Sequence, residues 1–388
     1  MIQKILKDRL EFFPKSLYHS YENPLLLSHG DSHYYYSVNN EEPYIDLYNN
    51  VCHIGHSNPL VLDAVNKCYS TININTRYLN TSLTLYASHL MKYIPNSEKY
   101  KIIFTNSGSE SNDLALQIGM NYCRNINNLN IGSFETSYHG TTWLCNQVSH
   151  IDSKGFIKDV DFNILNTKFV PRDEKINEKY GLFIMEVIQG VGGNYDIDHD
   201  IVRNIRNNSD ILICDEVQTG FGRSGGTFWA FEKTGIIPDI ITCGKPIANG
   251  YPMGACIFRK ELEPYINNNY FNTFGGNNVA CSIAKVVLEE IENKEYIKHS
   301  EEMGNYIKQL LGDIENKKYI KNITGSGLFL GIHFVDSIDV KKLVECLKDN
   351  MSVIAGIGYG NCIRIKPPLT ITKSCILNFV LYLDILLN

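Results

Sequence analysis

Four short apolar runs, each ending at a polar residue or a turn, constrain the fold of this chain more than any other feature. They cover residues 102–104, 182–185, 211–214 and 240–241, and helix-like stretches follow them. Continuous apolar runs of this length are typical of parallel-sheet strands, because helices cover both faces of such a sheet. The pattern predicts an α/β fold with a mostly parallel central sheet.

Chemically useful side chains follow each of the four runs. The turn 106–112 follows the first run, and Glu186, Asp215 and Lys245 follow the others. In open parallel sheets, ligands bind beyond the carboxyl ends of the strands. We therefore expect these groups to meet at one small-molecule site.

Lys245 and Asp215 together indicate a particular chemistry. A lone Lys is most often a solvated surface residue, but in a closed apolar site its amine loses proton affinity and attacks aldehydes to form an imine. Asp215 by itself is equally consistent with a metal ligand, a helix cap or a structural ion pair. Beside a lysine-bound pyridine ring, its carboxylate keeps the ring nitrogen protonated, so that the ring accepts electrons from a substrate carbanion. The pair predicts pyridoxal 5′-phosphate (PLP) as the cofactor, held by a Schiff base on Lys245.

The other cofactor contacts are expected close to these two residues. Gly108 and Ser109 open a helix directly after a strand, where free N–H groups favour a phosphate, although an ordinary serine cap gives the same pattern. Tyr138 is a candidate for stacking on the ring, with Val217 on the opposite face, although an aromatic side chain is more often part of a core. Gln218 is the candidate partner for the ring's phenolic oxygen.

Two other motifs point to different kinds of site. Residues 220–225 match the G-x-G-x-x-G dinucleotide-binding fingerprint, with Asp239 about twenty residues from its start. However, the segment 227–235 is a poor crossover helix, and Asp239 precedes the next strand, whereas ribose binding requires an acid at that strand's far end. His53 and His56 lack a third ligand, so no metal site is expected. A dehydrogenase and a metalloenzyme are both disfavoured.

The composition narrows the partners and the cellular location. A formal net charge of −6 gives no reason to expect a nucleic-acid or anionic-membrane surface. Charges interrupt the apolar residues of segment 1–16, and no run is long enough to span a bilayer. We expect a cytoplasmic protein whose 11 cysteines are free thiols.

Longer motifs between about Tyr44 and Thr372 resemble the class III aminotransferases of the PLP fold-type I superfamily. They are TNSGSESNDLAL, SYHGTT, FIMEVIQGVGG, ICDEVQTGFGRSG, DIITCGKPIANGYPMGA and NTFGGNNVAC. The resemblance implies the PLP-dependent transferase fold type I, with a smaller α/β domain built from both chain ends. Residues 1–52 and 286–388 are expected to form that domain, residues 53–285 the large PLP-binding domain, and a long helical stretch from Asn278 onward the connection.

The resemblance also assigns roles to single residues. Lys245, Asp215, Gly108, Ser109, Tyr138 and Gln218 take the roles given above. Thr273, in NTFGGN, looks like the residue that reaches the phosphate in the neighbouring subunit, which implies a homodimer with shared active sites. Arg364 matches the arginine that receives the substrate's α-carboxylate. Relatives acting on ω-amines often cover that arginine with a Glu, but this chain has Val191 there, which favours an α-amino acid or an unusual amine.

Two enzymatic hypotheses follow, and both depend on Lys245. The leading one is an aminotransferase that moves an amino group from an amino acid or amine to a keto acid. The alternative is a phospho-lyase that eliminates phosphate from a phosphorylated amino alcohol or amino acid, because YIDLYNNVCHIGHSNP and NTRYLN are similar to ethanolamine-phosphate and phosphohydroxylysine phospho-lyases. A racemase, a decarboxylase or a non-catalytic PLP-binding protein remain further alternatives.

Overall fold

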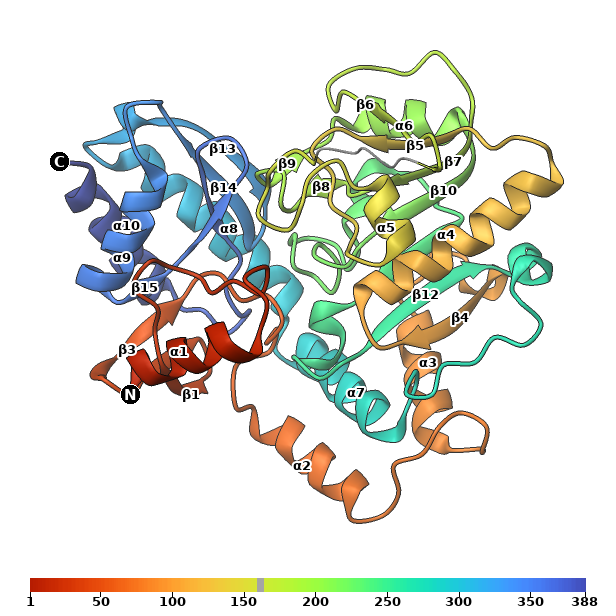
Figure 1. The fold of residues 1–388 in the computed structure, drawn as a ribbon, viewed down its shortest axis with the longest axis horizontal. Helices are drawn as coiled ribbons and strands as arrows, with labels where there is room; N and C mark the ends of the chain where they lie inside the picture. Colours follow the sequence, from red (N-terminus) through yellow and green to blue (C-terminus); the bar gives the residue numbers. More distant parts are fainter. Residues whose placement is uncertain (159–163) are drawn as a thin grey trace.

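The computed structural model describes residues 1–158 and 164–388, which form a larger and a smaller lobe (Figure 1). The larger lobe is built on a seven-stranded sheet with the order β4-β12-β11-β10-β7-β5-β6. In that order the strands are β4 (Tyr100–Thr105), β12 (Gly254–Arg259), β11 (Ile240–Cys243), β10 (Ser209–Asp215), β7 (Tyr180–Met185), β5 (Ile131–Phe134) and β6 (Lys168–Val170).

The large sheet is mostly parallel, as the sequence predicts. Strand β12 runs antiparallel to its neighbours β4 and β11, and the other strands share one direction. The four apolar runs correspond to β4, β7, β10 and β11, so that their carboxyl ends lie at one edge of the sheet. The predicted fold class is therefore confirmed.

Burial on both faces explains why these strands are continuous apolar runs. In β10, Leu212 and Cys214 pack into the core that contains helix α7 (Asn278–Asn293). The alternate residues Ile211 and Ile213 pack into a separate core under helix α4 (Gly108–Asn125). Because both faces are covered by helices, no polar alternation appears in the sequence.

The long helical stretch that was expected to connect the lobes is two helices. Glu295 lies between α7 and α8 (Tyr296–Asp313) with φ of +51°, a left-handed conformation that a right-handed helix does not include. Helix α7 packs on α2 (Pro59–Tyr69) and α3 (Thr81–Met91) of the larger lobe, and α8 packs on α10 (Lys373–Leu387) of the smaller one. The break therefore marks the passage between lobes.

Both chain ends build the smaller lobe, which Figure 1 shows with the red and blue segments side by side. The clearest link is a parallel pairing of β3 (Asn40–Asp46) with β15 (Val353–Ile354). The predicted domain boundaries at residues 52 and 285 stay predictions. The other elements of this lobe are α1 (Ile2–Phe12), β1 (Leu27–Asp31), β2 (Tyr34–Ser37), β13 (Ile320–Ser326), β14 (Phe329–Phe334), α9 (Val340–Met351), β16 (Gly356–Gly358) and β17 (Cys362–Ile365).

All eleven cysteines of the chain are free thiols. Among the helices that the structure describes, none has the length and apolar character needed to cross a bilayer. The remaining elements of the larger lobe are short, and they are α5 (Trp143–Val148), β8 (Ile188–Gln189), β9 (Tyr195–Asp196) and α6 (His199–Asn207).

Candidate active site

A cavity of about 290 Å³ lies at the carboxyl ends of the large sheet, where the sequence predicted that polar groups would meet. Its lining includes the turn 106–109 after β4, Glu186 after β7, Asp215 at the end of β10 and Lys245 after β11. Arg364 and Thr273 lie outside this lining. The predicted site residues that the cavity brings together are Gly108, Ser109, Tyr138, Asp215, Val217, Gln218 and Lys245.

Lys245 presents a free amine to the cavity from a strained backbone. Its φ of +35° is unusual for a residue with a side chain, and such strain persists where the surrounding structure fixes it, often at functional sites. Within the described residues, its Nζ has no hydrogen-bond partner. Burial lowers the pKa of Lys245, against the opposing effect of Asp215 and Glu186. A neutral, unpartnered amine is the form that attacks an aldehyde.

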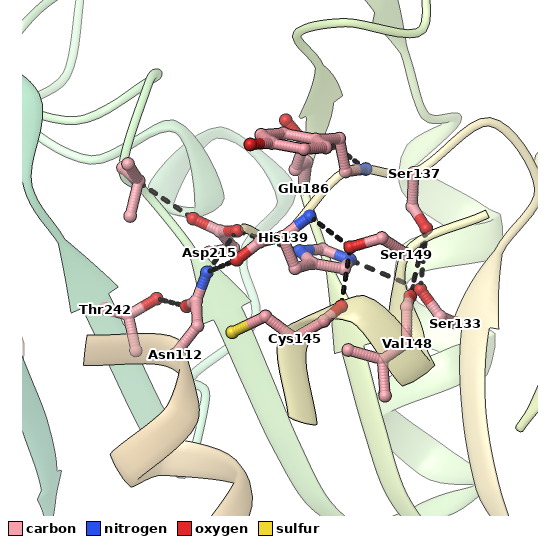
Figure 2. Close-up of polar contacts among 12 residues, drawn as sticks. Asn112, Ser133, Ser137, His139, Cys145, Val148, Ser149, Glu186, Asp215 and Thr242 are labelled. Carbon is pink, nitrogen blue, oxygen red and sulfur yellow. Dashed lines mark hydrogen bonds and ion pairs between the residues drawn. The ribbon is translucent and has the colours of Figure 1, made fainter. Parts of the chain in front are cut away.

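The Asp215 carboxylate is fixed by three donors and is only 4% exposed (Figure 2). Asn112 Nδ2 and His139 Nδ1 each donate to Oδ2 at 2.8 Å. The N–H of Val217 donates to Oδ1 at 3.0 Å. A carboxylate has about four acceptor positions, so one remains for a protonated ring nitrogen.

A second set of hydrogen bonds holds the donors of Asp215 in place. Asn112 Nδ2 also donates to the carbonyl of His139 at 2.8 Å, and Asn112 Oδ1 accepts from Thr242 Oγ1 on β11. The other ring nitrogen of His139 lies 3.2 Å from Ser133 Oγ on β5. Figure 2 shows this network beneath the carboxylate. Residues from α4, β5 and β11 therefore fix the orientation of the carboxylate.

The N-terminus of α4 is open toward the cavity. Ser107 caps the helix, because its Oγ accepts from the N–H of Glu110 at 3.1 Å. The N–H groups of Gly108 and Ser109 have no acceptor within the parts of the chain described, and both residues line the cavity. A Cβ at Gly108 would lie 2.5 Å from Val217 Cγ1, so only glycine fits there. This open helix start fits a phosphate, and with the free amine and the fixed carboxylate the cavity fits PLP.

Replacing Gly108 by alanine is expected to weaken PLP binding roughly 10- to 100-fold, because the new methyl group displaces Val217 and the helix start together. The dissociation constant measured from the cofactor's absorbance checks this. The matched control is Gly312→Ala, since a Cβ there meets nothing within 4 Å. Equal affinity in both variants would contradict the phosphate position.

Glu186 is a second carboxyl group in the lining to which the sequence assigned no role. It accepts from the N–H of Tyr138 at 3.2 Å and from the N–H of Gly190 at 3.0 Å. Burial raises the pKa of Glu186 to about 7. Tyr138 and Val217 both line the cavity, and their stacking on opposite ring faces stays a prediction.

Arg364 lines a second, wider cavity of about 850 Å³, together with Tyr18 and Tyr48. Its guanidinium donates to the carbonyls of Ile357 and Gly190 and, at 2.8 Å, to the hydroxyl of Tyr48. In the described ranges no carboxylate lies within 4 Å of it. A guanidinium has five N–H groups, so two remain for an anion. The side chain is buried, at 3% exposed, and its role in substrate binding stays a prediction.

Thr273 lies on an exposed segment and not at the cavity of its own chain. Its neighbour Asn272 accepts a hydrogen bond from Asn106, which lines the cavity, at 2.8 Å. The segment is therefore anchored beside the site while Thr273 faces outward. Its predicted contact with a phosphate in a second subunit stays a prediction.

The residues of the two disfavoured motifs make other contacts in the structure. In segment 220–225, Arg223 donates to the carbonyls of Leu328 and Pro367 and to His53 Nδ1. A 3-10 helix (Ala230–Thr234) follows this segment, where a dinucleotide site needs an α-helix start. His56 instead pairs with Asp46, with 2.9 Å between Nε2 and Oδ2.

The fold and the cavity define a PLP-dependent enzyme of fold type I. The family model described as aminotransferase class-III matches residues 18–384, so the chain belongs to the class III aminotransferases and uses PLP as its cofactor. It is 29% identical to ethanolamine-phosphate phospho-lyase homolog 1 of Caenorhabditis elegans, covering 94% of this chain and 88% of the relative. It is 30% identical to the mitochondrial alanine-glyoxylate aminotransferase 2 homolog 2 of Arabidopsis thaliana, covering 95% and 84%. A phospholyase from Arthrobacter in complex with phosphoethanolamine superposes with a TM-score of 0.89 at 26% identity, covering 99% of each chain.

Sequence reasoning assigned no role to three residues of the site, namely Asn112, His139 and Glu186. Each lies within one of the longer motifs, but its partner is distant in the chain. Asn112 lies 103 positions before its partner Asp215, and His139 lies 76 positions before the same residue. The position of Glu186 at the end of an apolar run was the one available signal. It indicated the site but not a role.

Proposed function

We propose that this enzyme transfers an amino group from an amino acid or amine to a keto acid. The observation that carries the proposal is the meeting of a free Lys245 amine and a fixed Asp215 carboxylate in one cavity. When bound, PLP supplies a ring that accepts electrons from a substrate carbanion. The aminotransferase family supports the choice of amino and keto-acid substrates.

In this proposal the chain's own residues handle protons and charge. Lys245 would hold the cofactor through its Nζ, and during turnover the same Nζ would remove and return a proton at the substrate carbon. The lowered pKa of Lys245 favours the neutral form that this task requires. Asp215 keeps the ring nitrogen protonated, and Asn112 and His139 hold the carboxylate in position.

We propose that Arg364 receives the carboxylate of the amino donor with its two remaining N–H groups. The homodimer with shared sites is also a proposal, in which Thr273 reaches the phosphate in the neighbouring subunit. Its exposed position beside the cavity supports this role. The cytoplasmic location stays a prediction.

The test is a half-reaction of the purified holoenzyme, followed by absorbance between about 300 and 500 nm without keto acid. An amino-acid panel should contain a donor that converts the visible band to a shorter-wavelength band while one equivalent of keto acid forms. Adding a keto acid should restore the visible band. A visible band that no amine changes would overturn the proposal.

A phospho-lyase is the second candidate function. The observation that favours it is the similarity to the C. elegans and Arthrobacter proteins named above. In this case phosphoethanolamine should release inorganic phosphate and ammonia in equal amounts without a keto acid. If phosphate is released while the visible band is retained, the reaction is an elimination and not a transamination. If no phosphate is released, the aminotransferase stays the proposed function.

A further inference from the structure

A buried lysine, Lys366, lies directly behind the cofactor cavity and is used by none of the steps above. It follows β17, is 5% exposed, and its N–H donates to the carbonyl of Leu47 at 2.8 Å. Its Nζ donates to Oε1 of Gln218 at 3.1 Å, and Gln218 lines the cavity. We propose that Lys366 is a positioning residue that turns the side-chain amide of Gln218 so that its N–H faces the cofactor.

The lysine has no opposite charge to explain its burial. In the chain as described, no carboxylate lies within 4 Å of Nζ, and the nearest ring is Tyr48, with 4.7 Å from Nζ to the ring centroid. Burial lowers the pKa of Lys366, and Arg364, Lys245 and Arg223 lower it further, with only Glu186 opposing. A lysine is almost never buried this way unless a specific polar contact holds it. The contact present here is the one to Gln218.

The hydrogen bonds around Gln218 leave one orientation for its amide. Asn50 Nδ2 also faces Oε1, at 3.5 Å, so two donors surround the same oxygen. Flipping the amide would place its NH₂ group against the NH₂ donor of Asn50, and against Lys366 Nζ whenever that amine is protonated. On the other side, a Cβ at Gly190 would lie 2.2 Å from Gln218 Nε2, so glycine leaves the room that the NH₂ group needs. The amide is therefore held as a donor.

A donor at this place has a measurable effect. This step rests on the proposed contact between Gln218 and the phenolic oxygen of PLP. A hydrogen bond to that oxygen stabilises the oxygen's negative charge, so the oxygen attracts the proton of the neighbouring imine less strongly. The imine formed with Lys245 then loses that proton at a lower pH. Removing the bond should raise that pH.

The experiment is a pH titration of the visible absorbance of the holoenzyme without substrate. In Lys366→Met, the titration midpoint should rise by roughly half to one pH unit, because the shorter of the two hydrogen bonds to Oε1 is lost and the amide is held less firmly. Gln218→Leu should raise it at least as much. The double variant should match Gln218→Leu alone, because a positioning residue has nothing left to position. Lys233→Met is the matched control, since that partly buried lysine also has a pKa lowered by burial, donates to Ser224 O, and lines none of the cavities described above.

The outcomes separate the inference from the proposed cofactor contact. An unchanged midpoint in Lys366→Met with a raised midpoint in Gln218→Leu overturns the role of Lys366 and leaves the contact intact. Additive shifts in the double variant also overturn it, because the lysine would then act through its charge alone. If neither single variant shifts the midpoint, the contact of Gln218 itself is wrong. If Lys366→Met does not fold, Lys366→Gln carries the test, with a smaller rise expected and no rise as the contradicting result.

Discussion

Lys245→Ala is expected to lose the visible absorption band and at least about 10³-fold of the turnover rate, because one amine holds the cofactor and moves the proton. Among the described residues no other lysine lines the cavity, and the nearby Lys366 is engaged with Gln218. The measurements are the absorbance spectrum with added PLP and the rate with the donor found in the half-reaction. Lys308→Ala is the control, because its Nζ donates to the carbonyl of Gly325 in the smaller lobe. Full turnover by Lys245→Ala would end the proposed function, including its phospho-lyase form.

Asp215→Asn is expected to keep PLP bound but to lower turnover by about 10²- to 10³-fold. An amide has no charge to keep the ring nitrogen protonated. It also places an NH₂ group either at Oδ1, where one bond from Val217 N–H is lost, or at Oδ2, where the two bonds from Asn112 and His139 are lost. The measurement is kcat at saturating substrate, together with the absorbance of the bound cofactor. Asp336→Asn, at an exposed position, is the control for the loss of one charge, and equal kcat in the two variants would contradict the role of Asp215.

The sequence predicted the large sheet well, because burial on both faces leaves a clear signature. Runs such as 211–214 are apolar at every position, and the residue after each run marks the strand's carboxyl end. Strand direction leaves no such signature: β12 is buried like its neighbour β11 but runs antiparallel to both β11 and β4. The break at Glu295 was equally invisible, since the residues around it favour a helix and only the backbone turn separates α7 from α8.

For the site, the sequence predicted which residues meet but not how they are held. The residues that follow strands, such as Lys245 and Asp215, come together because the sheet aligns the strand ends. The residues that orient them come from packed helices and loops, as Asn112 and His139 do, and no short motif encodes that packing. Lys366 had no signal of its own, because a lysine in RIKPP is expected at the surface.

The pairing of β3 with β15 has a consequence for how the chain is synthesised. Strand β15 leaves the ribosome about 300 residues after β3, which takes roughly 15 to 60 s at 5–20 residues per second. All seven strands of the large sheet emerge within that interval. The larger lobe can thus fold while the edge of β3 that later pairs with β15 is still unpaired. An unpaired strand edge of this kind can pair with another chain. Newly made protein is therefore most vulnerable to aggregation through its N-terminal strands, and this period ends only when residues 353–354 arrive.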